Sequence, residues 1–311
     1  MLRLVAALVV TALSAACGSE APPLALDPRE PGPGFEIRMH RDAEVGDVYR
    51  IVERWSLERV VEISRSGVIV ETVTLHRSAE LAADVLVVAV TPDGKELERR
   101  FTVRRFSYDW NGIPGAPIPE GSHIRVIGAR DGRGVIQWDG EEELPPDAVA
   151  ALRSVVSTVV RPGTDDEVFG TASRQAIGDR WAIDAARASG DLSSVPGLAV
   201  APGQVRGEGV LIGATQMAGI DCLVVDTTLH ADLREMPGPV AGAVVEAATL
   251  DVSISGHYPV ERGLPQLATE RQTRVEARGS VPALEAEGAD ATPGTFVMRA
   301  TTTASRRVIP R

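Results

Sequence analysis

The chain has 311 residues and a formal net charge of −11, and 44% of its residues are hydrophobic although only 4% are aromatic. This length and composition supply a core for one large domain or two ordinary ones. The acidic balance, without a block rich in Lys and Arg, argues against a nucleic-acid partner and against electrostatic binding to a membrane surface. Thirty Gly and 21 Pro residues favour many turns.

Residues 1–16 have the composition of a signal peptide. Arg3 is followed by an apolar run, Leu4–Leu13, that is too short to span a bilayer. Small residues then precede Cys17, which resembles a bacterial lipobox, where the Cys sulfur receives a diacylglycerol and becomes the first mature residue. A lipobox has Leu three residues before the Cys, whereas Leu13 lies four before it, and ordinary signal cleavage also fits. We expect a lipid-anchored chain, or a secreted one if Cys17 is not acylated.

Residues 17–34 form the predicted tether between this anchor and the folded body. Pro recurs through the segment, which disfavours helix and favours extended backbone at about 3 Å per residue. The pair Gly18-Ser19 lacks the Asp that retains some bacterial lipoproteins in the inner membrane. The outer membrane is therefore favoured over the inner one.

Two similar stretches lie 132 residues apart, Gly46-Asp47-Val48-Tyr49 and Gly178-Asp179-Arg180-Trp181. In each, a Gly that accepts positive φ and an Asp that can hydrogen-bond nearby backbone precede a run with an aromatic residue, which is typical of a turn entering a strand. We interpret them as the opening strands of two related β-rich halves, residues 35–163 and 164–311.

Period-two alternation of apolar and polar residues predicts strands through both halves. In the run from 223 to 233, for example, the apolar residues are Leu223, Val225, Leu229, Ala231 and Leu233. The run 49–63 also fits an amphipathic helix, although less well than it fits a strand.

The arginines of the run 96–108 lie on both of its faces, which predicts an edge strand or a solvent-exposed one. The predicted strands are 49–63, 68–76, 81–90, 96–108, 124–127, 135–138, 209–215, 223–233, 248–260, 266–277 and 296–305, with a further strand at Trp181.

One helix is predicted near 147–160. Pro145, Pro146 and Asp147 form a start signal, a stripe of Val and Leu residues follows at helical spacing, and Pro162-Gly163 ends it. We expect this helix to cover one face of a sheet.

The sequence contains no nucleophile elbow, phosphate loop or dinucleotide-binding motif, and its five histidines lack the spacing of a metal site. His230 and His257 lie on the polar faces of neighbouring predicted strands, where polar outward residues are the simpler interpretation. Cys222 lies in an apolar run and is interpreted as a small buried hydrophobe. No catalytic residue, metal or cofactor is predicted.

The signal segment, the tether, the paired Gly-Asp-x-aromatic openings and the step Gly263-Leu264-Pro265 together resemble an uncharacterised family of bacterial envelope lipoproteins with a duplicated β-rich domain. The resemblance covers most of residues 40–305. At the level of fold the chain is also similar to the Lol-type lipoprotein carriers, which implies a curved antiparallel sheet that wraps an apolar ligand beneath covering helices. The family brings no catalytic residues.

We therefore expect a mainly β (α+β) fold with curved antiparallel sheets in two related halves and one covering helix. The leading functional hypothesis is a non-enzymatic envelope lipoprotein that binds an apolar ligand or a protein partner on a concave β face. The candidate ligand-binding residues are Trp55, Trp138, Trp181 and Tyr258. A structural or assembly component without a ligand pocket is the alternative, and a secreted hydrolase using residues such as His230 and His257 is less favoured.

Overall fold

The computed structural model describes residues 34–115, 118–130, 133–140, 143–195, 197–261, 263–282 and 293–310. The predicted signal peptide, Cys17 and all but the last residue of the 17–34 tether lie outside these residues.

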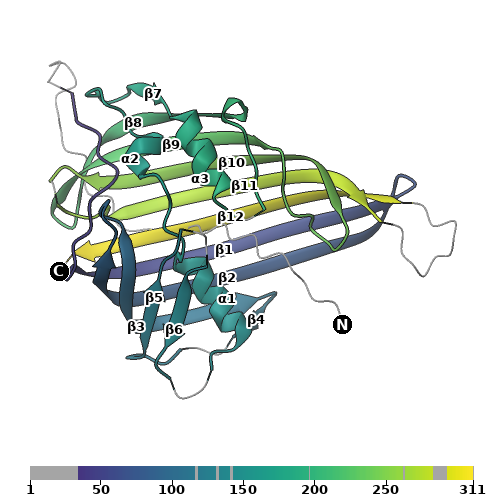
Figure 1. The fold of residues 1–311 in the computed structure, drawn as a ribbon, viewed down its shortest axis with the longest axis horizontal. Coiled ribbons are helices and arrows are strands. Elements are labelled where there is room, and N and C mark those ends of the chain that lie inside the picture. The colour runs from purple at the N-terminus through teal and green to yellow at the C-terminus, as the bar shows by residue number, and fades with distance from the viewer. Residues whose placement is uncertain are drawn as a thin grey trace.

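Within the described residues, twelve strands form one open antiparallel sheet (Figure 1). Its order is β6-β5-β3-β2-β1-β12-β11-β10-β9-β8-β7, with β4 paired to β3. The predicted mainly β fold is confirmed, but the strands of both predicted halves belong to the same sheet because β1 pairs with β12. The strands are β1 (Val48–Arg65), β2 (Val68–Val90), β3 (Glu96–Trp110), β4 (Ile113–Pro114), β5 (His123–Ile127), β6 (Val135–Trp138), β7 (Arg180–Ala182), β8 (Val205–Met217), β9 (Ile220–Leu233), β10 (Val244–Pro259), β11 (Ala268–Val281) and β12 (Gly294–Pro310).

Alternation along the long strands places their apolar residues on one face of the sheet, which we call the inner face. In β1 it carries Tyr49, Ile51 and Trp55, all of them buried. The sequence predicts two strands at 68–76 and 81–90, but β2 is continuous. Ala79 and Leu81 are both buried on the inner face, so the alternation runs unbroken through the join.

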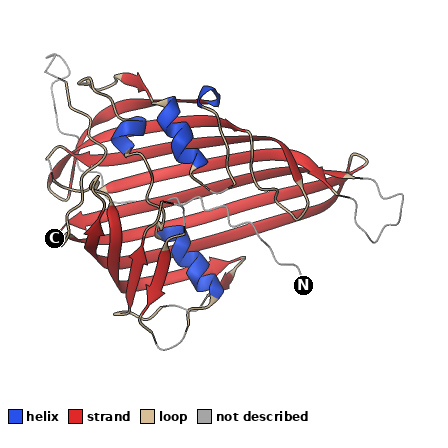
Figure 2. Ribbon diagram, in the orientation of Figure 1, coloured by secondary structure: helices blue, strands red, loops and turns tan. Residues whose placement is uncertain are grey.

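The helices lie over the inner face (Figure 2). The predicted helix is α1 (Pro146–Val155), which is shorter than expected because Val156 is already extended and Val159 bridges to Ala129. Two short helices, α2 (Asp165–Phe169) and α3 (Ala185–Ser193), and the single turn η1 (Pro202–Gln204) are additional. Among the described residues, none of these helices is long and apolar enough to cross a lipid bilayer.

The two Gly-Asp turns close in the same way. Gly46 and Gly178 have φ of 96° and 92°, and the carboxylates of Asp47 and Asp179 each accept a hydrogen bond from the backbone N–H three residues upstream. The N–H of Gly46 then donates to the Val87 carbonyl of β2, and the N–H of Gly178 donates to the Leu211 carbonyl of β8. The likeness is local, because β1 is an 18-residue central strand and β7 a three-residue edge strand. The duplication of whole halves stays a prediction.

Helices and strands enclose two large apolar clusters. One joins α1 to β1, β2, β3 and β5, and the other joins α2 and α3 to β8–β12. β1 and β12 contribute to both clusters, so they connect the two sides of the molecule. A smaller third cluster lies under β7 and the segment 35–42, which we call the strap.

Candidate functional site

A cavity of about 550 Å³ lies between the inner face and the chain segments that cross it. Its floor is formed mainly by β9–β12, and its roof by the chain from the end of α1 to the turn after α3. This volume is within the usual range of small-molecule sites, about 300–1,000 Å³. The apolar part of the wall includes Leu192, Val195, Leu198, Leu229, Met236, Leu250, Val252 and Ile254.

Val252 and Ile254 indicate that helices do not fill this part of the inner face. They continue the apolar alternation of β10, yet Leu250 is 4% exposed whereas Val252 and Ile254 are only half-buried. All three line the cavity. Apolar side chains that remain partly accessible inside a fold offer a surface for an apolar ligand.

Two arginines bring positive charge onto the inner face here. In the strand ladders, Arg271 of β11 lies between Ile254 of β10 and Ala304 of β12. Arg306 of β12 is two residues beyond Ala304 and opposite Thr269. Arg271 and Arg306 are therefore diagonal neighbours on one face, within reach of each other for side chains of this length.

Arg306 belongs to a charged network that reaches the centre of the sheet. Its Nε lies 3.5 Å from Oε1 of Glu53 on β1, and its guanidinium lies 6.0 Å from the ring centre of Tyr49. The Tyr49 hydroxyl donates to Oε1 of Glu96 at 2.5 Å. Burial alone would lower the pKa of Arg306, but the attraction of Glu53, Tyr49 and Glu96 raises it above its usual value. Burial raises the pKa of Glu53.

Arg271 lies in a less favourable electrostatic setting. Burial, and to a smaller extent the charge of Arg161, lower the pKa of Arg271 to about 10, although Asp165 acts in the opposite direction. A lowered pKa means that the surroundings disfavour the charged guanidinium.

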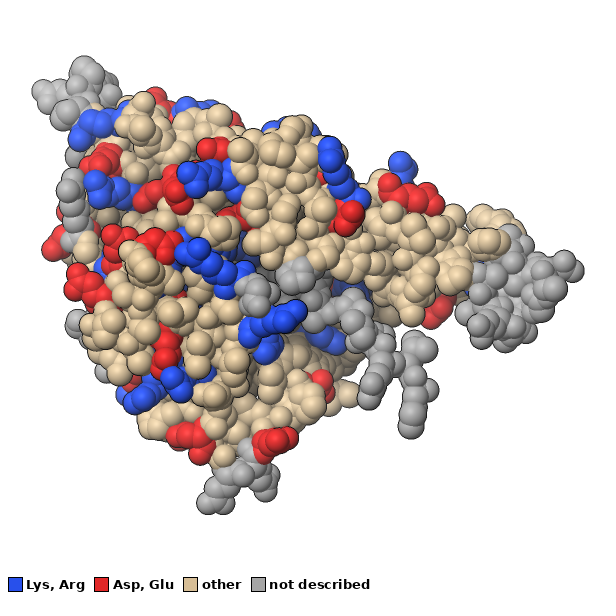
Figure 3. Space-filling model, viewed as in Figure 1, with Lys and Arg blue, Asp and Glu red and all other residues tan. Residues whose placement is uncertain are grey.

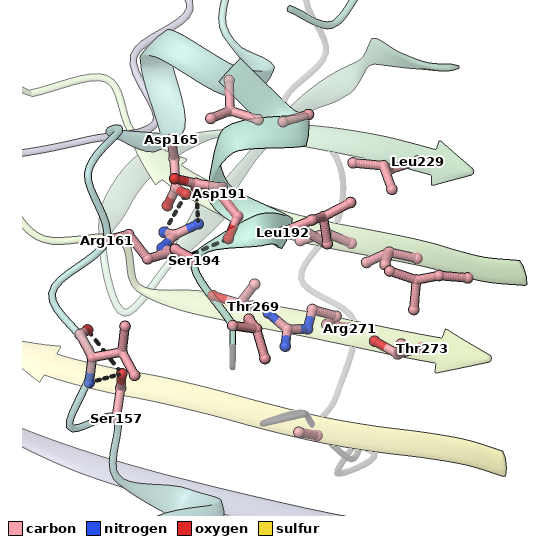
Figure 4. A pocket seen from close by; sticks show the side chains of 18 of the residues that line it. Ser157, Arg161, Asp165, Asp191, Leu192, Ser194, Leu229, Thr269, Arg271 and Thr273 are labelled. Atoms are coloured by element: carbon pink, nitrogen blue, oxygen red, sulfur yellow. Dashed lines mark hydrogen bonds and ion pairs between the residues drawn. The ribbon is translucent and has the colours of Figure 1, made fainter. Parts of the chain in front are cut away.

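Arg161 joins the covering segments to one another. One of its nitrogens lies 2.6 Å from Oδ1 of Asp165 in α2, and another lies 3.4 Å from Oδ2 of Asp191 in α3. Figure 4 shows Arg161 held between these carboxylates, on the side of the sheet toward which Arg271 and Thr273 project. The charge of Arg161 is thus matched within the protein.

Two threonine hydroxyls of the cavity wall have no hydrogen-bond partner among the described residues. Thr227 of β9 and Thr273 of β11 are each 2% exposed, and both line the cavity. Thr227 is paired with Ile254, which is in turn paired with Arg271. Since buried polar groups are normally hydrogen-bonded, these hydroxyls mark positions where a ligand or water oxygen would be satisfied.

The described lining of the cavity carries both arginines and carboxylates. Arg99 lies 3.4 Å from Oε2 of Glu96, and Arg306 lies 3.5 Å from Oε1 of Glu53. Basic side chains are visible in the middle of this face, between the surfaces over α3 and α1 (Figure 3). The charged side chains of the lining on the inner side of the sheet are Arg99, Arg153, Arg161, Arg271 and Arg306, with Glu53, Asp165 and Asp191.

A second cavity of about 570 Å³ adjoins the first at the strap. Both are lined by Met39, Tyr258 and Gln266. The strap is fastened to α2 by Asp166, whose two carboxylate oxygens accept the backbone N–H groups of Met39 at 2.5 Å and His40 at 3.1 Å. The strap therefore lies where the two cavities meet.

Of the four candidate ligand-binding residues from the sequence, Tyr258 lines the cavity and the three tryptophans do not. Trp55 packs edge-on against Trp110 in the α1 cluster, and Trp138 packs against the same cluster. Trp181 donates its indole N–H to the Phe169 carbonyl at 2.7 Å and lies so close over Gly209 that a Cβ there would be 2.3 Å from the ring. These tryptophans occupy packed positions beside the cavity.

The two histidines singled out from the sequence lie on the outer face. His230 Nδ1 lies 2.7 Å from Oδ1 of Asp251, its ladder partner on β10. His257 is half-buried, and burial lowers its pKa. No group of three or more His, Cys, Asp or Glu residues in the described parts of the chain is arranged to hold a metal ion. Cys222 is fully buried, as predicted, and burial raises its pKa to about 11.

The sequence predicts that 96–108 is an edge strand or a solvent-exposed one. The edge strand is wrong, because β3 pairs with β2 on one side and with β4 and β5 on the other, whereas Arg104 and Arg105 are solvent-exposed. Its arginines on both faces instead find partners across the sheet. Arg104 binds Asp84 and Arg105 binds Glu80 on the outer face, while Arg99 donates to the Ser157 carbonyl at 2.5 Å at the cavity wall.

Sequence reasoning did not find Arg271, Arg306, Thr227 or Thr273. The sequence signal for these four residues is a polar side chain at a position where the alternation predicts an apolar one. Along β9 the inner-face residues are Leu223, Val225, Thr227, Leu229, Ala231 and Leu233, with one polar member. β11 and β12 show the same interruption at Thr269–Thr273 and Thr302–Arg306. Strand pairing decides which of these polar positions become neighbours.

The protein is thus an open antiparallel sheet with helices over one face, and the cavity between them has the volume of a small-molecule site.

No protein-family model matches the chain, and no curated protein matches it. Among solved structures it is similar to lipovitellin, described for its lipid–protein interactions, with a TM-score of 0.30 and 10% identity over 84% of this chain and 25% of lipovitellin. The chain thus spans about a quarter of the length of that protein.

Two bacterial structures are also similar. A FadL homologue from Pseudomonas aeruginosa has a TM-score of 0.25 and 8% identity, over 89% of this chain and 99% of that one. A DUF1329 family protein from Desulfovibrio piger has a TM-score of 0.11 and 11% identity, over 80% and 83% of the two chains. The TM-scores are low, so the function is inferred from the cavity itself.

Proposed function

We propose that this chain is a non-enzymatic binding protein of the bacterial cell envelope that holds an apolar ligand between the inner face and the covering helices. The observation that carries the proposal is the cavity of about 550 Å³, whose wall includes the partly accessible side chains of Val252 and Ile254. A component without a ligand would gain stability by filling such a space, because an apolar void forfeits packing contacts.

The test is binding of a neutral apolar dye, N-phenyl-1-naphthylamine, measured by its fluorescence. In Val252→Trp the indole would occupy the cavity, so we expect dye affinity to fall by about 10-fold, with a modest loss of stability from overpacking. Ser253→Trp is the matched control, because Ser253 is the next residue of β10 and is exposed on the outer face. The control is expected to bind as the unmodified protein does.

Mass spectrometry of organic extracts of the purified protein supplies the second measurement. A co-purifying lipid-like molecule that is absent from Val252→Trp would support the proposal. If the dye does not bind and nothing co-purifies, the proposal is wrong and the structural or assembly component without a ligand pocket becomes the better hypothesis.

The envelope location is also a proposal, supported by the signal segment and Cys17 in the sequence. We propose an outer-membrane lipoprotein tethered through residues 17–34. The mass of the N-terminal peptide of the mature protein tests it: a diacylglycerol on Cys17 is expected, and an unmodified mature N-terminus released to the medium would show a secreted protein instead.

A further inference from the structure

We propose that the ligand is a long unbranched aliphatic lipid that lies lengthwise along β10, with its apolar end beside Met236 and its polar end at the strap. This inference rests on the proposed function, because it names the class and the orientation of the apolar ligand. It is carried by the length of the cavity, by the change in its wall from one end to the other, and by its junction with the second cavity.

The cavity follows one strand over a long distance. On β10 it is lined by Leu250, Val252, Ile254 and Tyr258. Leu250 and Tyr258 are eight residues apart, which corresponds to about 27 Å along a β-strand. An extended chain of 16 carbons is about 19 Å long, because its C–C bonds of about 1.5 Å follow a zigzag. A long-chain lipid therefore fits the cavity lengthwise, with space left for a polar end.

The end of the cavity at Leu250 is apolar in both its floor and its roof. The chain after α3 pairs with the chain after β9 through the bridge between Ala199 and Glu235, which brings Leu198 opposite Met236. Apolar side chains on these sides would remove the end of a hydrocarbon chain from water. The cavity residues at this end are Leu198, Leu233, Met236, Pro237 and Leu250.

From the ladder row of Ile254 toward Tyr258 the wall becomes polar. Arg271 is the ladder partner of Ile254, and Arg306 lies in the next inner-face row. Glu53 lies 3.5 Å from Arg306, so this pair supplies polar groups without a net charge. Contact with hydrocarbon would remove water from these charges at a cost in free energy. This half of the cavity is therefore less suited to the apolar end of a ligand than the half at Leu250.

Beyond Tyr258 lies the strap, where the second cavity adjoins the first. Met39, Tyr258 and Gln266 line both cavities. The second cavity is polar, with charged side chains of the strap such as Arg38 and Arg41 in its wall. A polar group costs less free energy in such surroundings than it does against hydrocarbon. The polar end of the lipid therefore belongs at the strap.

The first experiment measures displacement of N-phenyl-1-naphthylamine by primary alcohols of increasing length. The series is 1-decanol, 1-dodecanol, 1-tetradecanol and 1-hexadecanol, in which the hydroxyl is constant and only the apolar chain varies. Since each buried methylene contributes to binding, we expect the affinity to rise by about 10-fold for each two carbons added, up to 1-hexadecanol.

Leu250→Trp places an indole at the apolar end and shortens the space for the chain. We expect 1-hexadecanol to bind this variant about 10-fold more weakly than the unmodified protein, whereas 1-decanol should stay within about 2-fold. Ser253→Trp is the matched control, because Ser253 is exposed on the outer face of the same strand, and it should leave every affinity unchanged.

The second experiment is photoaffinity labelling of the unmodified protein. Two forms of 1-hexadecanol carry a diazirine, either beside the hydroxyl or at the methyl end, and mass spectrometry locates the labelled peptides. The methyl-end probe should label the segments around Leu198 and Met236, and the hydroxyl-side probe those around Met39 and Gln266. An excess of unlabelled 1-hexadecanol should suppress both.

Each result has one meaning. If the dye binds but the alcohols show no dependence on chain length, or Leu250→Trp weakens all of them equally, the inference is wrong and the proposed function stands. Labelling of both ends by both probes, or in the reverse order, also overturns the inference. If neither the dye nor any alcohol binds, the proposed function is wrong as well. If Leu250→Trp does not fold, the labelling of the unmodified protein decides.

Discussion

Asp84 shows at the scale of one residue how the outer face differs from the inner one. Its carboxylate on β2 lies 3.0 Å from Nε of Arg50 on β1 and 2.6 Å from a terminal nitrogen of Arg104 on β3. These charges are bound to one another at the surface, across three neighbouring strands. The inner face, in contrast, is mainly apolar, and several of its charged side chains lie where β1, β11 and β12 line the cavity. Charge pairs between strands therefore stabilise the outer face, whereas apolar packing under the helices stabilises most of the inner one.

The Asp84 contacts give a prediction about pH. Partial burial alone would raise the pKa of Asp84, but the hydrogen bonds and charges of Arg50 and Arg104 outweigh it and lower the pKa. An Asp in the unfolded chain has a pKa of about 3.9. Because the folded-state pKa is lower, the stabilisation is complete above that value and is lost as the pH falls through the folded-state pKa.

We therefore expect Asp84→Asn to lower the free energy of unfolding by about 1 kcal/mol at pH 7, because its arginine partners are partly exposed. The difference from the unmodified protein should shrink when urea denaturation is repeated near pH 3. Glu71→Gln, which removes an exposed carboxylate of the same strand, should change stability little at either pH. A difference for Asp84→Asn that stays constant with pH would contradict the assignment.

At the scale of elements, the long strands and α1 could be predicted because each carries its own repeating pattern. The alternation of β9 and the stripe of α1 are each contained in one segment, so the local sequence was enough. α2 and α3 were missed because they have five and nine residues, too few for a clear period. Their caps are visible in retrospect: Thr164 and Glu167 form a reciprocal capping box, and the Asp184 carboxylate accepts two backbone N–H groups.

The candidate site could not be predicted in the same way, because it is assembled by pairing between strands. Arg271 comes to lie between Ile254 and Ala304 only after β10, β11 and β12 take their register. The sequence favoured the tryptophans as ligand-binding residues because they are large apolar side chains. In the structure these side chains fill packed positions and do not line the cavity. The cavity occurs instead where half-buried aliphatic residues and threonines line a part of the sheet that the helices do not fill.

At the scale of the whole molecule, the first and last strands of the sheet meet at its centre. β1 pairs with β12 over most of its length. The two strands supply Tyr49, Ile51, Trp55, Ala304 and Val308 to the cluster under α1, and Val61, Ile63, Phe296, Met298 and Ala300 to the cluster under α2 and α3. Neither cluster can lose β1 or β12 without disrupting the other, so we expect the described body to unfold as one cooperative unit.

Phe296 tests this expectation because it lies in the cluster that contains no tryptophan. It is 1% exposed, and Phe296→Ala should cost about 3–5 kcal/mol through lost apolar burial and the cavity left behind. If the molecule is one cooperative unit, the variant lowers the midpoint of unfolding equally by far-ultraviolet circular dichroism and by tryptophan fluorescence. The fluorescence reports chiefly on Trp55, Trp110 and Trp138, which belong to the other cluster. Val297→Ala, on the exposed outer face of β12, should leave both midpoints nearly unchanged. If residues 35–163 and 164–311 were instead independent domains, Phe296→Ala in a Trp181→Phe background would shift one circular-dichroism step and leave the fluorescence midpoint in place, because the remaining tryptophans all lie in 35–163.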